Sequence, residues 1–266
     1  MGKVILITGV SSGFGLATAE LLAARGHTVY GVARRSMDHP KIHCLQGDVR
    51  DRQAVERLVQ SVIEREQRID ILINNAGMGI GGAVELATSE EIGIQMDTNF
   101  MGCVNLCQSV LPHMRRQGSG RIINISSIGG VMGLPYQGFY SASKFAIEGM
   151  SEALSAEVKR FGIQVSLVEP GDFATGFTAS RRNSEVTLKD ASYGPVFRHS
   201  LELIEREENG GLKPVKMARR IVRIVECRRP RLRYVVANAE QWLSVAIKRI
   251  LPGNLFVGIL RSYYKS

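Results

Sequence analysis

Short apolar runs alternate along the first 170 positions with segments in which apolar residues recur every three or four positions. The runs predict strands buried on both faces, and the helical spacing predicts helices with one buried face. The predicted strands are Val4–Thr8, Thr28–Val32, Ile42–Leu45, Ile71–Asn74, Arg121–Ser126, Gln164–Glu169 and, further along, Arg233–Val236. The predicted helices between them are Gly13–Ala24, Asp51–Gln67, Thr88–Gly118 and Tyr140–Phe161. This alternation favours an α/β fold with a doubly wound parallel sheet.

The chain becomes less regular after Pro170. Residues 171–195 are rich in Thr, Ser and Gly and predict a mobile loop, followed by a short helix over Leu201–Glu208. Pro214 suits the first turn of a further helix that runs to about Cys227. Beyond 237, apolar residues alternate with basic ones. We therefore expect one domain over residues 1–237 and a C-terminal amphipathic helical extension over 238–266.

Basic residues are concentrated in the C-terminal part of the chain. The net charge is +9, yet Lys213 to the end holds 13 basic and 2 acidic residues, so the remainder is slightly acidic. This distribution argues against a general nucleic-acid surface. The four cysteines and five histidines form no ligand-like cluster, so we expect no metal site. The strand that starts at Lys3 is too short to cross a bilayer, and we expect a cytoplasmic protein.

A glycine-rich turn follows the first predicted strand, in the order Thr8-Gly-Val-Ser-Ser-Gly-Phe-Gly15. Glycines permit a tight turn and close approach of a pyrophosphate, and the next helix supplies N–H donors and a favourable dipole. Glycines at an ordinary strand–helix turn are the alternative. The position at the first strand–helix junction of a doubly wound sheet favours dinucleotide binding.

The end of the second strand bears on the choice of cofactor. A carboxylate there would accept hydrogen bonds from the ribose hydroxyls of NAD, but Tyr30-Gly-Val-Ala-Arg-Arg35 contains no acid before Asp38. Arg34 is able to form a forked contact with a 2′-phosphate, and Ser11 adds a hydroxyl donor. The alternative is that Arg34 and Arg35 form a solvated turn. We predict NADP(H).

Tyr140 and Lys144 lie four positions apart on a predicted helix, so their side chains share one face. A phenol with an ordinary pKa of about 10 is a poor acid or base near neutral pH. A nearby ammonium group stabilises the phenolate and lowers the pKa. A pair with this spacing is also common on exposed helices. Ser127, at the end of the fifth strand, and Asn99 favour a catalytic interpretation.

Several short motifs occur in an order that points to one family. They are TGVSSGFG (8–15), Gly47-Asp48-Val49, Asn74-Asn-Ala-Gly77, Asn99, Ser127, Tyr-Ser-Ala-Ser-Lys (140–144) and Pro170-Gly171. Over residues 3–175 the chain resembles the single-domain branch of the short-chain dehydrogenase/reductases, which implies a Rossmann-like fold. The turn, the VARR strand end and the long C-terminal extension are most similar to the hydroxysteroid/retinol-dehydrogenase-like subgroup.

The resemblance implies four catalytic residues. Ser127 would hydrogen-bond the substrate oxygen, and Tyr140 would exchange the proton with it. Lys144 would also hold the nicotinamide ribose, and Asn99 would kink its helix and hold a water that relays protons to Lys144. The expected activity is interconversion of a ketone or aldehyde with an alcohol, with NADP(H) as the hydride carrier.

The resemblance also extends the cofactor site beyond the glycine turn. Asp48 and Val49 would flank the adenine, and Pro170, Gly171 and Thr175 would hold the nicotinamide side. Phe14 and Asp172 depart from common forms of the family, and Asp172 leaves the detail near the nicotinamide open. The full expected set is Gly9, Ser11, Ser12, Gly13, Phe14, Gly15, Arg34, Arg35, Asp48, Val49, Asn75, Ala76, Gly77, Tyr140, Lys144, Pro170, Gly171 and Thr175.

Apolar and aromatic residues near these motifs suggest a lipophilic substrate, such as a steroid, a retinoid or a long-chain ketone. Candidate walls are Met78–Gly82, Met132, Leu134, Tyr136, Phe139, Phe173 and Phe177, with a role in the core as the alternative. The C-terminal extension is expected to pack over the pocket as a lid or dimer element. Peripheral contact with an anionic membrane surface is the alternative.

Two other functions are consistent with parts of the pattern. A non-catalytic nucleotide sensor on this fold predicts a lost tyrosine or lysine, yet Tyr140 and Lys144 are both present. An extended-type epimerase or dehydratase on nucleotide sugars requires a different glycine spacing and a longer substrate domain. We also expect a homodimer or homotetramer, paired through the helices predicted at about 89–117 and 140–161.

Overall fold

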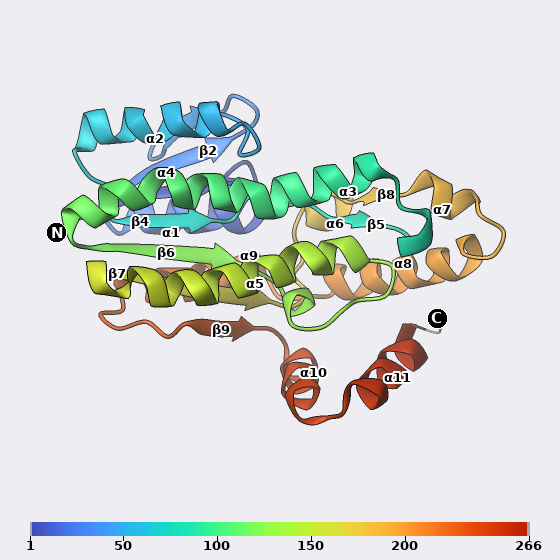
Figure 1. Ribbon diagram of the computed structural model, residues 1–266. Coiled ribbons are helices and arrows are strands. Elements are labelled where there is room, and N and C mark those ends of the chain that lie inside the picture. Colours follow the sequence, from blue (N-terminus) through green and yellow to red (C-terminus); the bar gives the residue numbers. More distant parts are fainter. Residues whose placement is uncertain (1, 265–266) are drawn as a thin grey trace.

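Seven parallel strands form the central sheet of the computed structural model, which describes residues 2–264 (Figure 1). In chain order they are β1 (Val4–Thr8), β2 (Thr28–Ala33), β3 (His43–Gln46), β4 (Ile71–Asn74), β6 (Gly120–Ile125), β7 (Ile163–Pro170) and β9 (Arg233–Val236). Across the sheet the order is β3-β2-β1-β4-β6-β7-β9, so the winding direction reverses between β1 and β4. The Rossmann-like doubly wound fold is confirmed, and its ligand crevice is expected at the β1/β4 junction.

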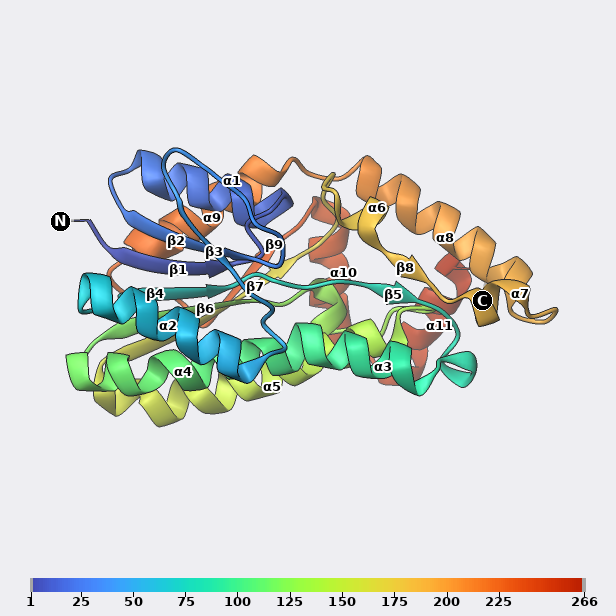
Figure 2. The ribbon, with the colours of Figure 1, turned by 90° about the horizontal axis from the view of Figure 1, so that it is seen from above.

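Helices cover both faces of the sheet (Figure 2). The helices α1 (Gly13–Ala24) and α9 (Pro214–Glu226) lie on one face, and α2 (Arg52–Glu66), α4 (Gly102–Gln117) and α5 (Gly138–Val158) lie on the other. Alternate residues of a strand enter opposite cores: Leu6 packs with α2, α4 and α5, whereas Ile5 and Ile7 pack with α1 and α9. The strands are apolar throughout because both faces are buried.

The helix predicted over Thr88–Gly118 is three consecutive helical segments. A capping box between Thr88 and Glu91 begins α3 (Ser89–Met96), as the sequence indicates. A π-helical turn over Asp97–Met101 follows and leads into α4, which ends at Gly118 in a left-handed conformation. The π turn shifts the helix where Asn99 points toward the sheet edge, and such turns are frequent at functional sites.

The segment after Pro170 has more regular structure than a mobile loop. It contains α6 (Phe177–Ser180), β8 (Arg182–Asn183) and α7 (Glu185–Lys189). The strand β8 pairs in parallel with β5 (Ile80–Gly81), so the backbone amides of this segment have partners far away in the sequence. Next comes α8 (Gly194–Asn209), which starts seven residues before the predicted helix.

Two helices follow the last strand of the sheet, α10 (Ala239–Ile250) and α11 (Gly253–Tyr264). In Figure 1 they lie below β9, outside the two helix layers. The Asn238 side chain caps α10 by accepting a hydrogen bond from the amide of Gln241 at 2.8 Å. Val245 and Phe256 pack on Met132 in a small apolar cluster. Among the described residues, no helix is both long and apolar enough to span a membrane.

A buried carboxylate lies beneath the sheet edge. Glu169 on β7 is fully buried, its nearest cation is Arg233 on β9 at 3.5 Å, and neither carboxyl oxygen has a hydrogen-bond partner among the described residues. Burial raises the pKa of Glu169 to about 7, and the neighbouring Glu148 adds to the shift. Between about pH 4.5 and 7 the Glu169 carboxyl is protonated in the folded state and ionised in the unfolded state. Glu169 therefore lowers the free energy of unfolding as the pH rises through this window.

We expect Glu169→Gln to leave stability at pH 4.5 nearly unchanged and to raise the free energy of unfolding at pH 8 by about 2 kcal/mol. Urea unfolding at both pH values measures the difference. Glu152→Gln is the matched control, because Glu152 contacts the same Arg233 at 3.2 Å but is exposed. Loss of stability at pH 8 in Glu169→Gln would mean that the Glu169–Arg233 ion pair is favourable.

Candidate active site

Hydrogen bonds between the ends of β1 and β4 fix the centre of the crevice. The Thr8 hydroxyl accepts hydrogen bonds from the amides of Asn75 and Ala76, each at 3.0 Å. The Asn75 side-chain amide donates in return to the carbonyl of Thr8 at 2.9 Å. These bonds hold the segment after β4 against the glycine turn that follows β1.

The glycine turn forms a cradle that side chains would fill. Gly9 and Gly13 have φ values of +73° and +59°, which disfavour other residues. A Cβ at Gly15 would lie 2.1 Å from the carbonyl oxygen of Gly9, so the backbone of α1 approaches the turn too closely for a side chain. The first turn of α1 contains no acidic residue, which leaves its positive end available to an anion. The turn therefore fits the pyrophosphate of a dinucleotide.

A cavity of about 1000 Å³ lies along this edge of the sheet. It is large for a ligand pocket, which suits a dinucleotide and a substrate together. Nearly all of the sequence-predicted site residues line it; the exceptions are Gly15, which packs under the turn, and Asn99. The predicted residues brought together there are Gly9, Ser11, Ser12, Gly13, Phe14, Arg34, Arg35, Asp48, Val49, Asn75, Ala76, Gly77, Ser127, Tyr140, Lys144, Pro170, Gly171 and Thr175.

One end of the cavity is basic. Arg34 and Arg35 follow β2, and both side chains are exposed to the cavity. Asp48 is bound by the guanidinium of Arg50, with contacts of 2.7 and 3.0 Å. The hydrogen bond from Arg50 keeps the pKa of Asp48 below its usual value. The acid at this end is therefore already paired with Arg50, and Arg34 and Arg35 add two further positive charges.

Tyr140 and Lys144 lie on α5, facing Ser127 at the end of β6. The Ser127 hydroxyl accepts a hydrogen bond from the amide of Gly129 at 3.0 Å. Lys144 is buried, and its amine donates to the carbonyl of Ile125 at 2.9 Å. The same amine lies 5.8 Å from the centre of the Tyr140 ring. Helix α5 and the turn that follows β6 thus place a hydroxyl, a phenol and an amine at one edge of the sheet.

The protonation behaviour of Tyr140 differs from the sequence-based expectation. Burial raises the pKa of Tyr140 to about 12, and a hydrogen bond with Ser127 only partly opposes this. Burial also lowers the pKa of Lys144 to about 8. The Lys144 amine donates to the carbonyl of Ile125, and within residues 2–264 no hydrogen bond joins it to the phenol oxygen. At neutral pH Tyr140 is protonated, which suits a group that donates a proton to a carbonyl oxygen.

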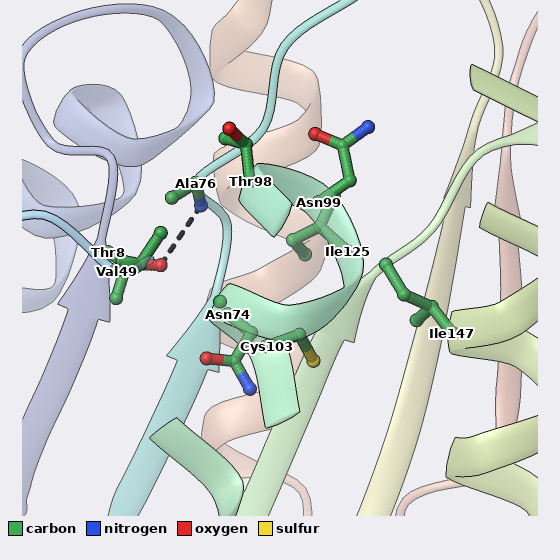
Figure 3. Close-up of a pocket in the computed structure, with 10 residues that line it drawn as sticks. Thr8, Val49, Asn74, Ala76, Thr98, Asn99, Cys103, Ile125 and Ile147 are labelled. Carbon is green, nitrogen blue, oxygen red and sulfur yellow. Dashed lines mark hydrogen bonds between the residues drawn. The ribbon is translucent and has the colours of Figure 1, made fainter. Parts of the chain in front are cut away.

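Asn99 lies beside the large cavity, on the π-helical turn. Its side-chain oxygen accepts from the amide of Met78 at 2.9 Å, and its amide donates to the Met78 carbonyl and the Ser143 hydroxyl, each at 3.0 Å. Asn99 and Asn74 also line a small cavity of about 10 Å³, shown in Figure 3. The Asn74 side-chain oxygen there has no partner among residues 2–264, so one water would fit by size and chemistry.

The cavity has an acidic wall that was not predicted from the sequence. Glu207 and Glu208 on α8 join Asp172 there. Arg181 pairs with Glu208, Gln241 donates to Asp172, and Tyr263 donates to Glu207. Burial raises the pKa of Asp172 to about 6 and the pKa of Glu207 to about 7. In the sequence, only Asp172 after Pro-Gly pointed to an acid in the cavity. Glu207 and Glu208 gave no signal, because two glutamates on a polar helix are ordinary.

The remaining cavity walls are largely apolar. Predicted residues that line the cavity are Met78, Met132, Leu134, Phe173 and Phe177. Tyr136 and Phe139 do not line it: Tyr136 packs against Phe197, with ring centres 5.3 Å apart, and has a φ of +58°. The helix α11 packs over the cavity, as the favoured interpretation of the extension predicted. It contributes Phe256, Ile259, Leu260, Tyr263 and Tyr264.

Residues 3–186 match the short chain dehydrogenase family. This chain belongs to the short-chain dehydrogenase/reductase family. It is 52% identical to a 3-ketodihydrosphingosine reductase of Bacteroides thetaiotaomicron, over 98% of both chains. It is 32% identical to an NADPH-dependent 3-dehydrocapnine reductase of Ornithobacterium rhinotracheale, over 92% of both. A short-chain dehydrogenase structure from Streptomyces avermitilis superposes with a TM-score of 0.81 at 32% identity, covering 98% of this chain and 93% of the other.

If Tyr140 supplies the proton, Tyr140→Phe lowers kcat by about 10²- to 10⁴-fold without weakening cofactor binding. Steady-state reduction of a ketone and fluorescence titration with the cofactor measure the two quantities. Tyr136→Phe is the matched control, because it removes a nearby phenol that does not line the cavity. Comparable losses in both variants would indicate a structural effect and contradict the assignment of Tyr140.

Proposed function

We propose that this protein is an NADPH-dependent ketone reductase that acts on a long-chain amino ketone of the 3-ketodihydrosphingosine class. The observation that carries the proposal is one cavity in which the glycine cradle, Tyr140, an acidic wall and an apolar wall meet. Identity of 52% to a 3-ketodihydrosphingosine reductase over almost the whole length supports the substrate class.

The proposed chemistry assigns one task to each residue. A bound NADPH supplies a hydride to the carbonyl carbon. Ser127 donates a hydrogen bond to the substrate oxygen, and Tyr140 donates the proton that converts the oxygen to a hydroxyl. Lys144 binds the nicotinamide ribose and favours proton loss from Tyr140 through its positive charge. Asn99 would hold a water that relays protons to Lys144.

The basic end of the cavity supports NADPH over NADH. Within residues 2–264 the side chains of Arg34 and Arg35 form no ion pair and could contact a 2′-phosphate, whereas Asp48 is already bound to Arg50. The remaining cofactor contacts are those that the glycine turn, Asn75–Gly77 and Pro170–Thr175 would make. The NADPH-dependent relative agrees with this choice.

The acidic wall supports an amine on the substrate. In 3-ketodihydrosphingosine an amino group is bonded to the carbon beside the ketone, and it carries a positive charge when protonated. Asp172, Glu207 and Glu208 line the same cavity as Tyr140, and the charges of Asp172 and Glu208 act on the Tyr140 phenol. Glu208 is already paired with Arg181, but a rigid neutral ketone such as a steroid would bury Asp172 and Glu207 without a cationic partner of their own.

Turnover of a ketone would favour this assignment over a nucleotide sensor. An epimerase or dehydratase on nucleotide sugars is disfavoured because it requires a different glycine spacing and a longer substrate domain. We also propose a cytoplasmic location and a homodimer or homotetramer formed through α4 and α5. We divide the chain into a catalytic domain over residues 1–237 and an extension over 238–266.

Purified protein is expected to oxidise NADPH when 3-ketodihydrosphingosine is added and to form the corresponding 3-hydroxy product, detected by mass spectrometry. Acetylating the amine removes its charge and should lower kcat/KM by about tenfold or more, because an ammonium–carboxylate contact is lost. A steroid ketone is the second comparison. Equal turnover of the charged and acetylated ketones would contradict the role of the acidic wall, and absence of turnover would contradict the substrate class.

Arg34→Ala is expected to weaken NADPH binding about 10- to 100-fold and to leave NADH binding nearly unchanged, because only NADPH carries the 2′-phosphate. Fluorescence titration of both cofactors measures the change. Arg25→Ala serves as a control, since Arg25 pairs with Glu226 away from the cavity. An equal effect on both cofactors, or a wild-type preference for NADH, would rule out the assignment of NADPH.

A further inference from the structure

Exposed apolar side chains are concentrated in the last two helices. Twelve large hydrophobic residues are exposed within residues 2–264, and seven of them lie in α10 and α11. The other five are on five different elements. Such a local excess marks an interaction surface, whereas scattered exposed apolar residues are ordinary. The seven are Trp242, Leu243, Ile250, Leu255, Val257, Ile259 and Tyr263.

The apolar arc of α11 is wider than the part that the body covers. Phe256 and Tyr264 are buried against the body. Leu255 and Ile259 lie to one side of this buried stripe and Val257 lies to the other, and all three are at least half exposed. Packing on the body therefore explains only part of the helix, and its outer apolar residues have no role in the core.

The charges of this helix pair are almost all positive. Lys248, Arg249 and Arg261 lie on α10 and α11, and Glu240 in the first turn of α10 is the one acid there. The Lys248 amine also lies 5.2 Å from the centre of the Phe256 ring. Basic residues beside exposed Trp and Leu side chains are typical of a helix that rests in the interface of an anionic membrane.

Part of the opening of the active-site cavity lies at the same helix. Ile259 and Tyr263 line the cavity and are also exposed to solvent, at 51% and 43%. Figure 1 shows α10 and α11 outside the helix layers, so a flat surface could approach them without meeting α4 or α5. A second protein copy seated on these residues would instead cover this part of the opening and bring the basic residues of the two copies together.

We propose that α10 and α11 dock on an anionic lipid surface and present the cavity mouth to it, so that the alkyl chain of the substrate enters along Ile259 and Tyr263. Docking depends only on the surface of the helices. Entry of the chain rests on the proposed function, since it requires a long-chain substrate.

Co-sedimentation of the full-length protein with lipid vesicles tests docking without any substrate. The wild type is expected to sediment with vesicles of phosphatidylglycerol and phosphatidylcholine, less with phosphatidylcholine alone, and less at high salt. The triple variant Ile250→Ser, Leu255→Ser, Val257→Ser changes only outer residues that do not line the cavity. It should bind the anionic vesicles about tenfold or more weakly.

Matched variants separate docking from general surface effects. Val186→Ser with Val215→Ser removes exposed apolar side chains elsewhere and should bind like the wild type. Arg249→Gln with Arg261→Gln should weaken binding to anionic vesicles, whereas Lys216→Gln with Arg219→Gln on α9 should not. Cofactor titration confirms that each variant is folded.

Turnover distinguishes docking from substrate entry. The triple variant should reduce a short-chain, water-soluble amino ketone like the wild type, and reduce the long-chain ketone presented in vesicles more slowly. Failure of the wild type to bind anionic vesicles, equal losses in the control variants, or a lower oligomeric mass of the triple variant in light scattering would overturn the proposal. Vesicle binding without turnover of either ketone would contradict the proposed function alone.

Discussion

The need to cover both faces of a parallel sheet governs the architecture of this protein. Every parallel connection has to cross back over one face, so all strands end at the same edge. Thr8, Asn75, Ser127 and Gly171 are far apart in the sequence and meet there for this reason. The bonds between Thr8 and Asn75 then set the spacing of the two strand ends at the reversal of the winding. The cofactor cradle and the catalytic helix are both placed relative to that junction.

Features encoded by local sequence were predictable. Val4–Thr8, Gly13–Ala24 and Ile71–Asn74 form the expected elements at the expected residues, because continuous apolar strands and a glycine-rich turn depend on few distant contacts. The position of the cavity at this edge followed from the same local signals, and most of the residues that the family motifs single out line that cavity. Membership of the short-chain dehydrogenase/reductase family was likewise predictable, because short motifs in a characteristic order indicate it.

Features that depend on tertiary contacts were not predictable. Glu207 and Glu208 look like solvent-facing positions until α8 packs beside Asp172 and α11. Tyr136 appeared suited to the pocket, but its left-handed backbone turns the ring toward Phe197. The pairing of β5 with β8 involves two residues on each side, too few for a pattern. The pKa of Tyr140 depends on burial and on the carbonyl that holds Lys144, and neither is visible in the spacing of the two residues.

At the C-terminus, the helices that line the cavity are separate from the strands that build the sheet. The strand β9 completes the sheet at Val236, before α10 begins, so α10 and α11 contribute walls to the cavity without contributing strands to the fold. Changes at the apolar residues of α11, such as Phe256 and Ile259, can therefore alter the substrate part of the cavity without changing the strands of the sheet. The amino-acid sequence of the tail is therefore constrained by the shape of the cavity and not by the pairing of the strands.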